Sequence, residues 1–226
     1  MRTVRARSSG KSTTIAREYL DPFIVAGLAA FLLITFVART YYIPSASMVP
    51  TLKVGDVLLV NKFEYRFTKP HEGDIVVFPP PVPTTDDYIK RVIGRPGDRL
   101  RIQSGTVYLN GKALNEPYIA EPPAYNLVIR NYNIYVTEIG DPTSFEPLDP
   151  SRANVPPRRF WTAPDRIPNN FYFMMGDNRN DSEDSHVWGF AQLSGPFAGG
   201  PEKGKPSGFT GRAFVIFWPL SHARII

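Results

Sequence analysis

Short apolar runs separated by turn residues recur along the chain and predict strands rather than long helices. Two of these runs follow a Gly-Asp pair, in 51–61 and 73–78, and Lys90–Leu100 has the pattern of a strand, a turn and a second strand. Phe171–Met175 and Gly211–Trp218 continue the pattern. β-branched and aromatic residues favour strands, while Gly-Asp and Pro-Gly pairs mark turns. We therefore expect a mainly β fold of antiparallel sheets.

The stretch 111–170 differs from its surroundings, because it is polar and holds ten of the 23 prolines of the chain. Proline has no backbone N–H and is kept out of central strands, so this stretch reads as an excursion from the core. We expect an inserted proline-rich β subdomain at 111–170, and a core made of 40–110 and 171–226.

One apolar run is long enough to cross a membrane. Residues 22–38 carry no charge and Arg39 closes the run; about 17 to 25 residues span a bilayer. The preceding 1–21 hold five basic and two acidic residues, which indicates a cytoplasmic N-terminus. We expect a cytoplasmic tail at 1–21, a single transmembrane helix at 22–39 and an exported remainder. A cleaved signal peptide or a buried soluble helix is the alternative, and the long basic region favours the uncleaved anchor.

Charge and composition exclude several classes of protein. The net charge is +5, but the first 21 residues supply +3 of it, and the rest of the chain is close to balance. We find no basic run interleaved with aromatics, so we expect no nucleic-acid partner. The chain has no cysteine, which excludes a thiol nucleophile and thiolate metal ligands. We expect neither a cofactor nor a metal.

A candidate nucleophile follows the apolar run. In 43–52 (IPSASMVPTL) two prolines restrict the backbone around Ser45 and Ser47, so that a hydroxyl can be held in a fixed direction. Serine beside proline is also common in plain turns. A serine nucleophile needs a base, and a triad of Ser47 with His186 and Asp184 is one possibility.

Lys90 is the other candidate base, because a Ser-Lys pair is also an attested solution. It lies between Tyr88-Ile89 and an apolar strand. A lysine must be neutral to act as a base, and its reference pKa is near 10.4. Burial lowers a lysine pKa, and Tyr88, Ile89 and Met48 are candidates for the apolar wall. A solvated surface lysine is the alternative interpretation.

Four segments together resemble the boxes of a known family. Pro44–Leu52 is similar to the serine box of bacterial signal peptidase I (leader peptidase), the serine endopeptidases with a Ser/Lys dyad. Tyr88–Gly94 with Pro96-Gly97-Asp98 resembles the lysine box of that family, and Gly73–Phe78 its strand box. Met175–Ser185, continuing to Trp188-Gly189, resembles its Gly-Asp-Asn-rich box. The order of the boxes after an N-terminal apolar run is also that of the family.

The resemblance implies a role for each matching residue. Ser47 would be the nucleophile and Lys90 the general base, with the Ser45 hydroxyl and the Ser47 N–H forming the oxyanion hole. Ser182 would orient the lysine amine. Structural support is implied for Arg91, Asp177, Asp184 and His186. Shallow pockets for small residues of the substrate are implied for Tyr41, Ile43, Pro44, Met48, Leu52, Val77, Tyr88 and Ile89, although core packing is the simpler role for Leu52 and Val77.

The implied activity is the removal of N-terminal signal peptides from exported pre-proteins, after Ala-x-Ala-like ends and through an acyl-enzyme. The implied partners are pre-proteins and the lipid bilayer, and the implied place is the bacterial plasma membrane, with the catalytic domain on the exported side. Two other readings use the same residues. One is an inactive membrane-tethered scaffold of this fold; the other is a self-cleaving Ser-Lys repressor, which needs a DNA-binding helix-turn-helix that 1–39 does not offer.

One residue departs from the family pattern. The family has an arginine two residues after the aspartate that matches Asp184, whereas this chain has His186. An imidazole is only partly charged near neutral pH. We therefore expect this brace to be weaker than in the family and to depend on pH. The short N-terminal region also differs from family members with two membrane spans.

Overall fold

The computed structural model describes residues 21–28, 38–141, 144–195 and 208–226. The chain divides into two compact units, Met1–Arg39 and Thr40–Ile226. Residues 21–28 are helical, and among the described residues no helix has the length and apolar character needed to cross a membrane. Most of the expected tail at 1–21 and half of the expected anchor at 22–39 lie outside the described residues, so both stay predictions.

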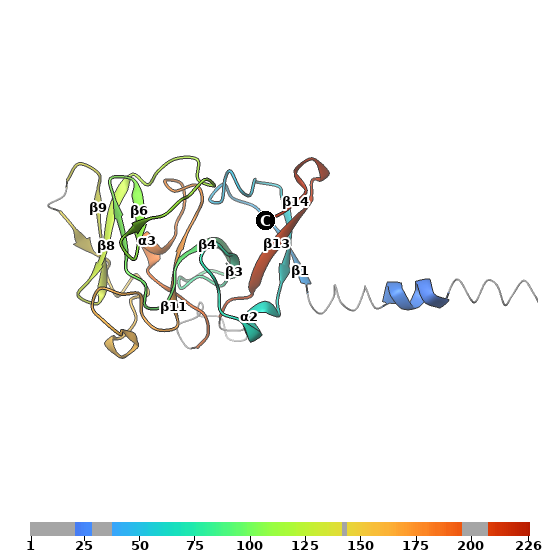
Figure 1. Cartoon of the computed structure of the whole chain (residues 1–226), viewed down its shortest axis with the longest axis horizontal. Helices are drawn as coiled ribbons and strands as arrows, with labels where there is room; N and C mark the ends of the chain where they lie inside the picture. The colour runs from blue at the N-terminus through green and yellow to red at the C-terminus, as the bar shows by residue number, and fades with distance from the viewer. Residues whose placement is uncertain (1–20, 29–37, 142–143, 196–207) are drawn as a thin grey trace, which may run out of the picture. The chain divides into compact units, whose positions relative to one another are not determined.

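The unit Thr40–Ile226 is mainly β and built of antiparallel sheets, as the apolar runs predict (Figure 1). The larger sheet has eight strands. In spatial order they are β1 (Ala38–Tyr42), β2 (Val57–Asn61), β13 (Gly211–Trp218), β3 (Ile75–Phe78), β4 (Tyr88–Gly94), β11 (Phe171–Met175) and β12 (Ala191–Gln192), with β14 (Arg224–Ile225) paired to β13. The predicted run Gly211–Trp218 thus becomes a strand between β2 and β3, which precede it by far in the chain.

The smaller sheet has six strands and lies at the left of the body in Figure 1. In spatial order they are β10 (Glu146–Pro147), β9 (Asn133–Glu138), β8 (Tyr125–Arg130), β5 (Leu100–Gln103), β6 (Thr106–Leu109) and β7 (Lys112–Ala113). The stretch 111–170 supplies four of these strands, and β5 and β6 come from before it. Four short helices complete the unit: α2 (Glu64–Phe67), α3 (Ser185–Trp188), and the 3-10 turns η1 (Arg158–Phe160) and η2 (Leu220–His222).

Strand β11 shows why the core strands read as continuous apolar runs. Its odd-numbered residues Phe171, Phe173 and Met175 enter one apolar cluster, and its even-numbered residues Tyr172 and Met174 enter another. Side chains alternate between the faces of a strand, so both faces of β11 are covered. Burial of each large apolar side chain contributes about 1.5–3 kcal/mol. This packing fixes β11 and its neighbour β4, which carry the residues of the candidate site.

The recurring Gly-Asp pairs form the same turn three times. In each, the glycine has a φ between +86° and +95°, a region that side chains with a Cβ avoid. The aspartate that follows accepts the backbone N–H of the residue three positions earlier, over 2.8–2.9 Å. The three turns are Lys53–Asp56, His71–Asp74 and Arg95–Asp98. They lead into β2, β3 and β5.

Candidate active site

The side chains of Ser47 and Lys90 meet in the folded chain. Ser47 lies in a turn after β1, where Leu52 N–H donates to Met48 O over 2.9 Å. Lys90 lies on β4, opposite Val76 of β3. Its Nζ is 2.8 Å from Ser47 Oγ, a hydrogen-bonding distance at which a neutral amine can take the hydroxyl proton. Ser47 of the serine box and Lys90 of the lysine box are therefore in direct contact.

The surroundings of Lys90 favour its neutral form. The residue is only 4% exposed, and its Nζ lies 5.5 Å from the ring centroid of Tyr88. Burial lowers the pKa of Lys90, although the charges of Asp184, Glu183 and Asp177 oppose this shift. The net direction is downward from the ordinary lysine value. A larger share of the amine is therefore neutral near physiological pH than in a solvated lysine.

Two other serines lie near Ser47. Ser45 Oγ is 3.4 Å from Ser47 Oγ, and its predicted place in an oxyanion hole stays a prediction. Ser182 Oγ is buried and has no hydrogen-bond partner among the described residues. A Cβ added to Gly176 would collide with both Ser182 Oγ and Ser47 O, so these two atoms flank the same glycine. The predicted role of Ser182 in orienting the amine stays a prediction.

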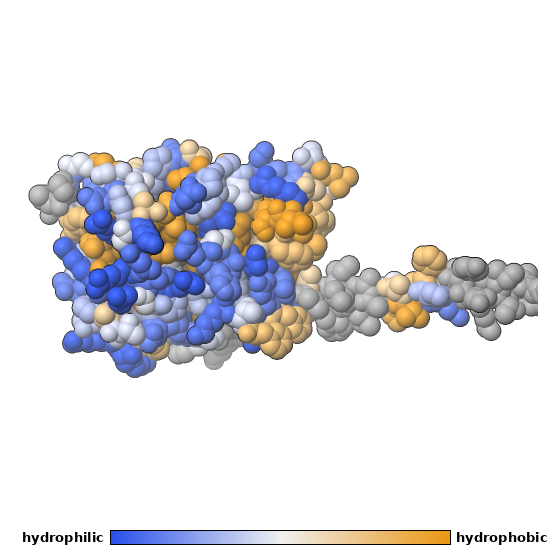
Figure 2. Space-filling model, viewed as in Figure 1, coloured by the Kyte–Doolittle hydropathy of each residue, from blue (hydrophilic) through white to orange (hydrophobic). Residues whose placement is uncertain are grey.

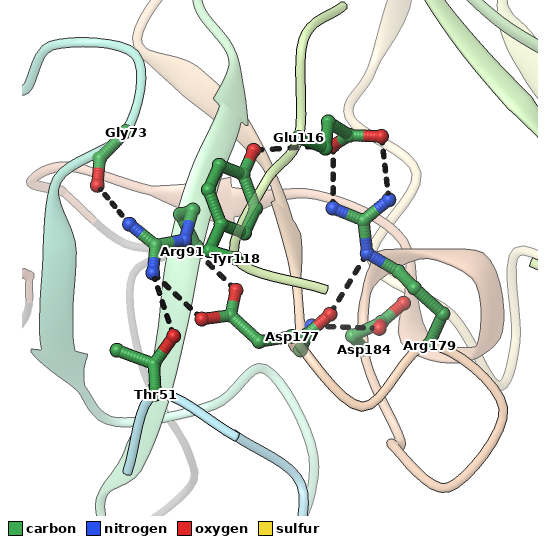
Figure 3. Close-up of polar contacts among 9 residues, drawn as sticks. Thr51, Gly73, Arg91, Glu116, Tyr118, Asp177, Arg179 and Asp184 are labelled. Carbon is green, nitrogen blue, oxygen red and sulfur yellow. Dashed lines mark hydrogen bonds and ion pairs between the residues drawn. The ribbon is translucent and has the colours of Figure 1, made fainter. Parts of the chain in front are cut away.

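Asp177 is held by Arg91 in a bidentate pair (Figure 3). Arg91 Nε donates to Asp177 Oδ1 over 2.8 Å and Nη2 to Oδ2 over 2.6 Å. Arg91 also donates to Gly73 O over 2.8 Å and, at 3.4 Å, to Thr51 Oγ1. Asp177 is fully buried. This arginine, which belongs to the lysine box, thus ties all four family-like segments together beside Ser47.

Asp184 caps helix α3 and also binds the loop beside Ser47. Its carboxylate accepts the N–H of His186 over 3.2 Å and that of Gly176 over 3.0 Å. His186 Nδ1 lies within hydrogen-bonding distance of the same carboxylate, and the imidazole stacks on the ring of Tyr125 with centroids 4.3 Å apart. His186 therefore occupies the bracing position where the family pattern has an arginine.

The histidines do not contact the nucleophile in the described part of the chain. His186 is bonded to Asp184, and His222 Nδ1 lies 2.9 Å from Asp56. His71 is exposed and faces Asp74. The hydroxyl of Ser47 instead contacts Lys90 and Ser45. This geometry favours the Ser-Lys pair over the Ser-His-Asp alternative.

The residues expected to line substrate pockets divide into two groups. Most belong to one apolar cluster around the serine segment: Ile43, Met48, Leu52 and Val77, with Tyr41 and Ile89 packed against it. Tyr88 packs in a different cluster, and Pro44 is exposed. Leu52 and Val77 have no exposed surface, so neither can touch a substrate directly in this conformation. Their position beneath the others agrees with core packing.

Several residues that sequence reasoning did not single out support the same loop. Asn178 N–H donates to Ser47 O over 3.1 Å, and its side chain donates to Ala46 O over 3.2 Å. Arg179 is fully buried and pairs with Glu116. The sequence signal that could have found Asn178 and Arg179 is their place within the Gly-Asp-Asn box. Nothing local marks Glu116, which lies 63 residues from its partner. The described residues contain no cluster of His, Asp or Glu able to hold a metal ion.

A serine hydroxyl bonded to a buried lysine amine, with no histidine in contact, is the arrangement of Ser-Lys hydrolases. Comparison with known proteins shows the family to which the chain belongs. The family model described as "Signal peptidase, peptidase S26" matches residues 16–199. "Probable signal peptidase I-2" of Synechocystis sp. is 36% identical over 231 residues, covering 99% of this chain and 84% of that protein. "Signal peptidase IB" of Staphylococcus aureus is 32% identical, covering 90% of each chain.

"Signal peptidase I" of Pseudomonas aeruginosa is 34% identical over 89% of this chain and 73% of that protein. A crystal structure of a signal peptidase I from Enterococcus faecalis covers 55% of this chain and 91% of that chain, at 27% identity and a TM-score of 0.36. The chain belongs to the signal peptidase I family, peptidase S26. It is a serine peptidase.

Proposed function

We propose that this protein is a membrane-bound endopeptidase that removes N-terminal signal peptides from exported pre-proteins, with Ser47 as nucleophile and Lys90 as general base. The observation that carries the proposal is the 2.8 Å contact between Lys90 Nζ and Ser47 Oγ, made by a buried amine whose pKa burial lowers. No histidine contacts the hydroxyl among the described residues, so Lys90 is the available base.

The reaction begins when neutral Lys90 takes the Ser47 proton as the hydroxyl oxygen attacks the scissile carbonyl. The tetrahedral oxyanion is held by the Ser45 hydroxyl and the Ser47 N–H. When the peptide bond breaks, the Lys90 ammonium gives its proton to the leaving amine, and an acyl-enzyme remains. Lys90, neutral again, then takes a proton from a water molecule that attacks the ester. The step releases the second product and regenerates the Ser47 hydroxyl.

The supporting residues keep this geometry. Arg91 fixes Asp177, and Asp184 with His186 fixes Gly176. The buried Ser182 hydroxyl would complete the set by orienting the Lys90 amine. These side chains act through others and do not touch the substrate.

The substrate would be an extended segment with small residues at the first and third positions before the cut. An extended segment can add to the edge of a sheet, so that backbone hydrogen bonds supply affinity and pockets supply selectivity. Tyr41, Ile43, Met48, Tyr88 and Ile89 would form the walls of these pockets, with Pro44 at the rim. Alanine-sized side chains fit shallow pockets of this kind, which favours Ala-x-Ala-like ends.

The proposed site of action is a bacterial plasma membrane. Residues 22–39 would be the single anchor, with the basic tail 1–21 in the cytoplasm and the catalytic core, 40–110 and 171–226, with its 111–170 insertion, on the exported side. Figure 2 shows hydrophobic surface over β14 and the end of the chain. Large apolar side chains are exposed there: Phe217, Trp218, Leu220 and Ile225. A surface of this kind suits contact with lipid.

Purified protein in detergent micelles and a precursor peptide ending in Ala-x-Ala would test the proposal. We expect the wild type to cut after the second alanine, as judged by mass spectrometry, and Ser47→Ala and Lys90→Ala to lose cleavage. Lys112→Ala, which removes an exposed lysine on β7, is the matched control and should cleave normally. Cleavage that survives either site substitution would refute the assignment of that residue.

A further inference from the structure

The segment between β7 and β8 carries Glu116, whose buried side chain pairs with Arg179 of the Gly-Asp-Asn box. The Glu116 carboxylate accepts from both terminal nitrogens of Arg179, over 3.0 Å from Nη1 and by a second bond from Nη2. The Arg179 side chain is fully buried and that of Glu116 is 6% exposed. Burial works against the charge of Arg179, but hydrogen bonding and attraction by Glu116 raise the pKa of the guanidinium. Glu116 and Arg179 therefore form a buried, bidentate ion pair (Figure 3).

The same segment reaches the site a second time through Tyr118. The Tyr118 hydroxyl donates to Glu116 Oε1 over 3.1 Å, and the Arg91 guanidinium lies over its ring, 4.0 Å from the centroid. Arg91 is the residue that holds Asp177. Glu116 and Tyr118 thus contact Arg179 and Arg91, the two arginines that donate hydrogen bonds to the Gly-Asp-Asn loop.

That loop bears directly on the nucleophile. Arg179 Nε donates to Gly176 O over 3.0 Å, and Asn178 donates to the carbonyls of Ser47 and Ala46. A continuous series of hydrogen bonds therefore runs from Glu116 through Arg179 and the 176–178 loop to the backbone of Ser47. A buried bidentate pair is a rigid link, because both groups lose their partner if either moves.

We propose that Glu116 and Tyr118 are positioning residues for the reaction, which set the place of the Ser47 backbone through Arg179 and the 176–178 loop. The inference rests on the proposed function, since it assumes that Ser47 is the nucleophile. Glu116 and Tyr118 lie near the start of the 111–170 stretch. This stretch would therefore contribute to catalysis as well as supplying strands of the six-stranded sheet.

Glutamine at position 116 keeps one acceptor oxygen but has no negative charge, so Arg179 becomes a buried cation that lacks its counter-charge and one of its hydrogen bonds. Such a cation must shift toward another acceptor or toward water. Either movement pulls on Gly176 and Asn178, and a displacement of about 1 Å at a reacting group can reduce the rate about 100-fold. Because Asn178 bonds to the carbonyls of Ser47 and Ala46 and not to the side chains of the proposed pockets, kcat should fall while KM changes little.

The experiment compares Glu116→Gln and Glu116→Asp with wild type on the same precursor peptide, using samples shown to be folded by circular dichroism. We expect kcat to fall about 10- to 100-fold in Glu116→Gln, with KM within about threefold, and Glu116→Asp to recover part of the loss. Tyr118→Phe, which keeps the ring on Arg91, should lose only a few-fold. Asp165→Asn breaks the exposed Arg99–Asp165 pair and is the matched control, expected to match wild type.

A double-variant cycle separates positioning from plain stability. Asn178→Ala removes the side-chain bond to Ala46 O at the far end of the series. If Glu116 acts through the loop, the double variant Glu116→Gln/Asn178→Ala loses clearly less than the product of the two single losses. Independent, multiplying losses would overturn the inference, as would wild-type kcat in folded Glu116→Gln, or in Glu116→Asp if the glutamine variant does not fold. The proposed function fails on different evidence, namely no cleavage by wild type or full cleavage by Ser47→Ala.

Discussion

Gly176 lies where the 176–178 loop meets the backbone of Ser47. The substitution Gly176→Ala therefore tests how closely the two segments are packed. The φ of Gly176 is outside the left-handed region, so the backbone accepts alanine and only space opposes it. The new Cβ would lie 2.6 Å from Ser182 Cβ and closer still to Ser182 Oγ and Ser47 O. Carbon atoms in contact are about 3.5–4.0 Å apart. The two sides must therefore separate by about 1 Å.

A shift of this size has two measurable effects. Overpacking of a tight site costs about 1–3 kcal/mol of unfolding free energy, which lowers Tm by roughly 2–10 °C for a protein of this size. A displacement of about 1 Å at the nucleophile lowers kcat about 100-fold, equal to about 2.7 kcal/mol of transition-state stabilisation. Thermal unfolding and steady-state cleavage of an Ala-x-Ala peptide measure the two quantities.

A matched control separates the two effects. Gly208 has a φ of +124°, and a Cβ there would collide with Leu193 O, so Gly208→Ala should lose a similar amount of stability. Its kcat per folded molecule should stay at the wild-type value. A folded Gly176→Ala enzyme with kcat within about threefold of wild type would show that the contact between the loop and Ser47 does not govern the reaction.

Three further predictions concern the reacting groups. Ser45→Ala should lower kcat about 100- to 1,000-fold at little change in KM, as loss of an oxyanion donor does; wild-type kcat would remove Ser45 from the oxyanion hole. Because burial lowers the pKa of Lys90, cleavage should fall as pH drops through that lowered value. Between that lowered value and the ordinary lysine pKa near 10.4, the unfolded chain binds a proton that the folded chain does not, so the unfolding free energy rises with pH, by about 1.4 kcal/mol per unit of pH at most. Urea titrations at several pH values should show that Lys90→Met lacks this slope, and an equal slope in both proteins would contradict the assignment. His186→Arg should keep activity, since an arginine can also pair with the Asp184 carboxylate; a folded variant that has lost cleavage would show that arginine cannot replace this brace.

Local pattern was sufficient for much of the fold. The apolar runs at Phe171–Met175 and Gly211–Trp218 are the strands β11 and β13 within the same bounds. Every residue of β11 is buried, and a strand covered on both faces is apolar along its whole length. The Gly-Asp pairs likewise predict turns, since a left-handed glycine and a capping carboxylate are local features. Mainly β architecture and membership of the family are confirmed.

The arrangement of the site depends on contacts that no local pattern records. The residues alone leave both Lys90 and His186 open as partners of Ser47, and only the folded chain brings the Lys90 amine within 2.8 Å of the Ser47 hydroxyl. Glu116 has no local signal, because an acid before a proline in a polar stretch is typical of the surface, whereas the fold pairs it with the buried Arg179. The roles of the matching residues, including Ser182, stay predictions.

The place of β13 between β2 and β3 has a consequence during synthesis. The segment with Ser47 leads into β2, and Lys90 follows β3, but these two halves of the large sheet are joined by a strand that the ribosome makes more than 110 residues after Lys90. Asn178, which donates a hydrogen bond to the Ser47 carbonyl, is also synthesised long after Ser47. A nascent chain therefore carries Ser47 and Lys90 long before it can align them, which would keep the peptidase inactive until β13 has been made.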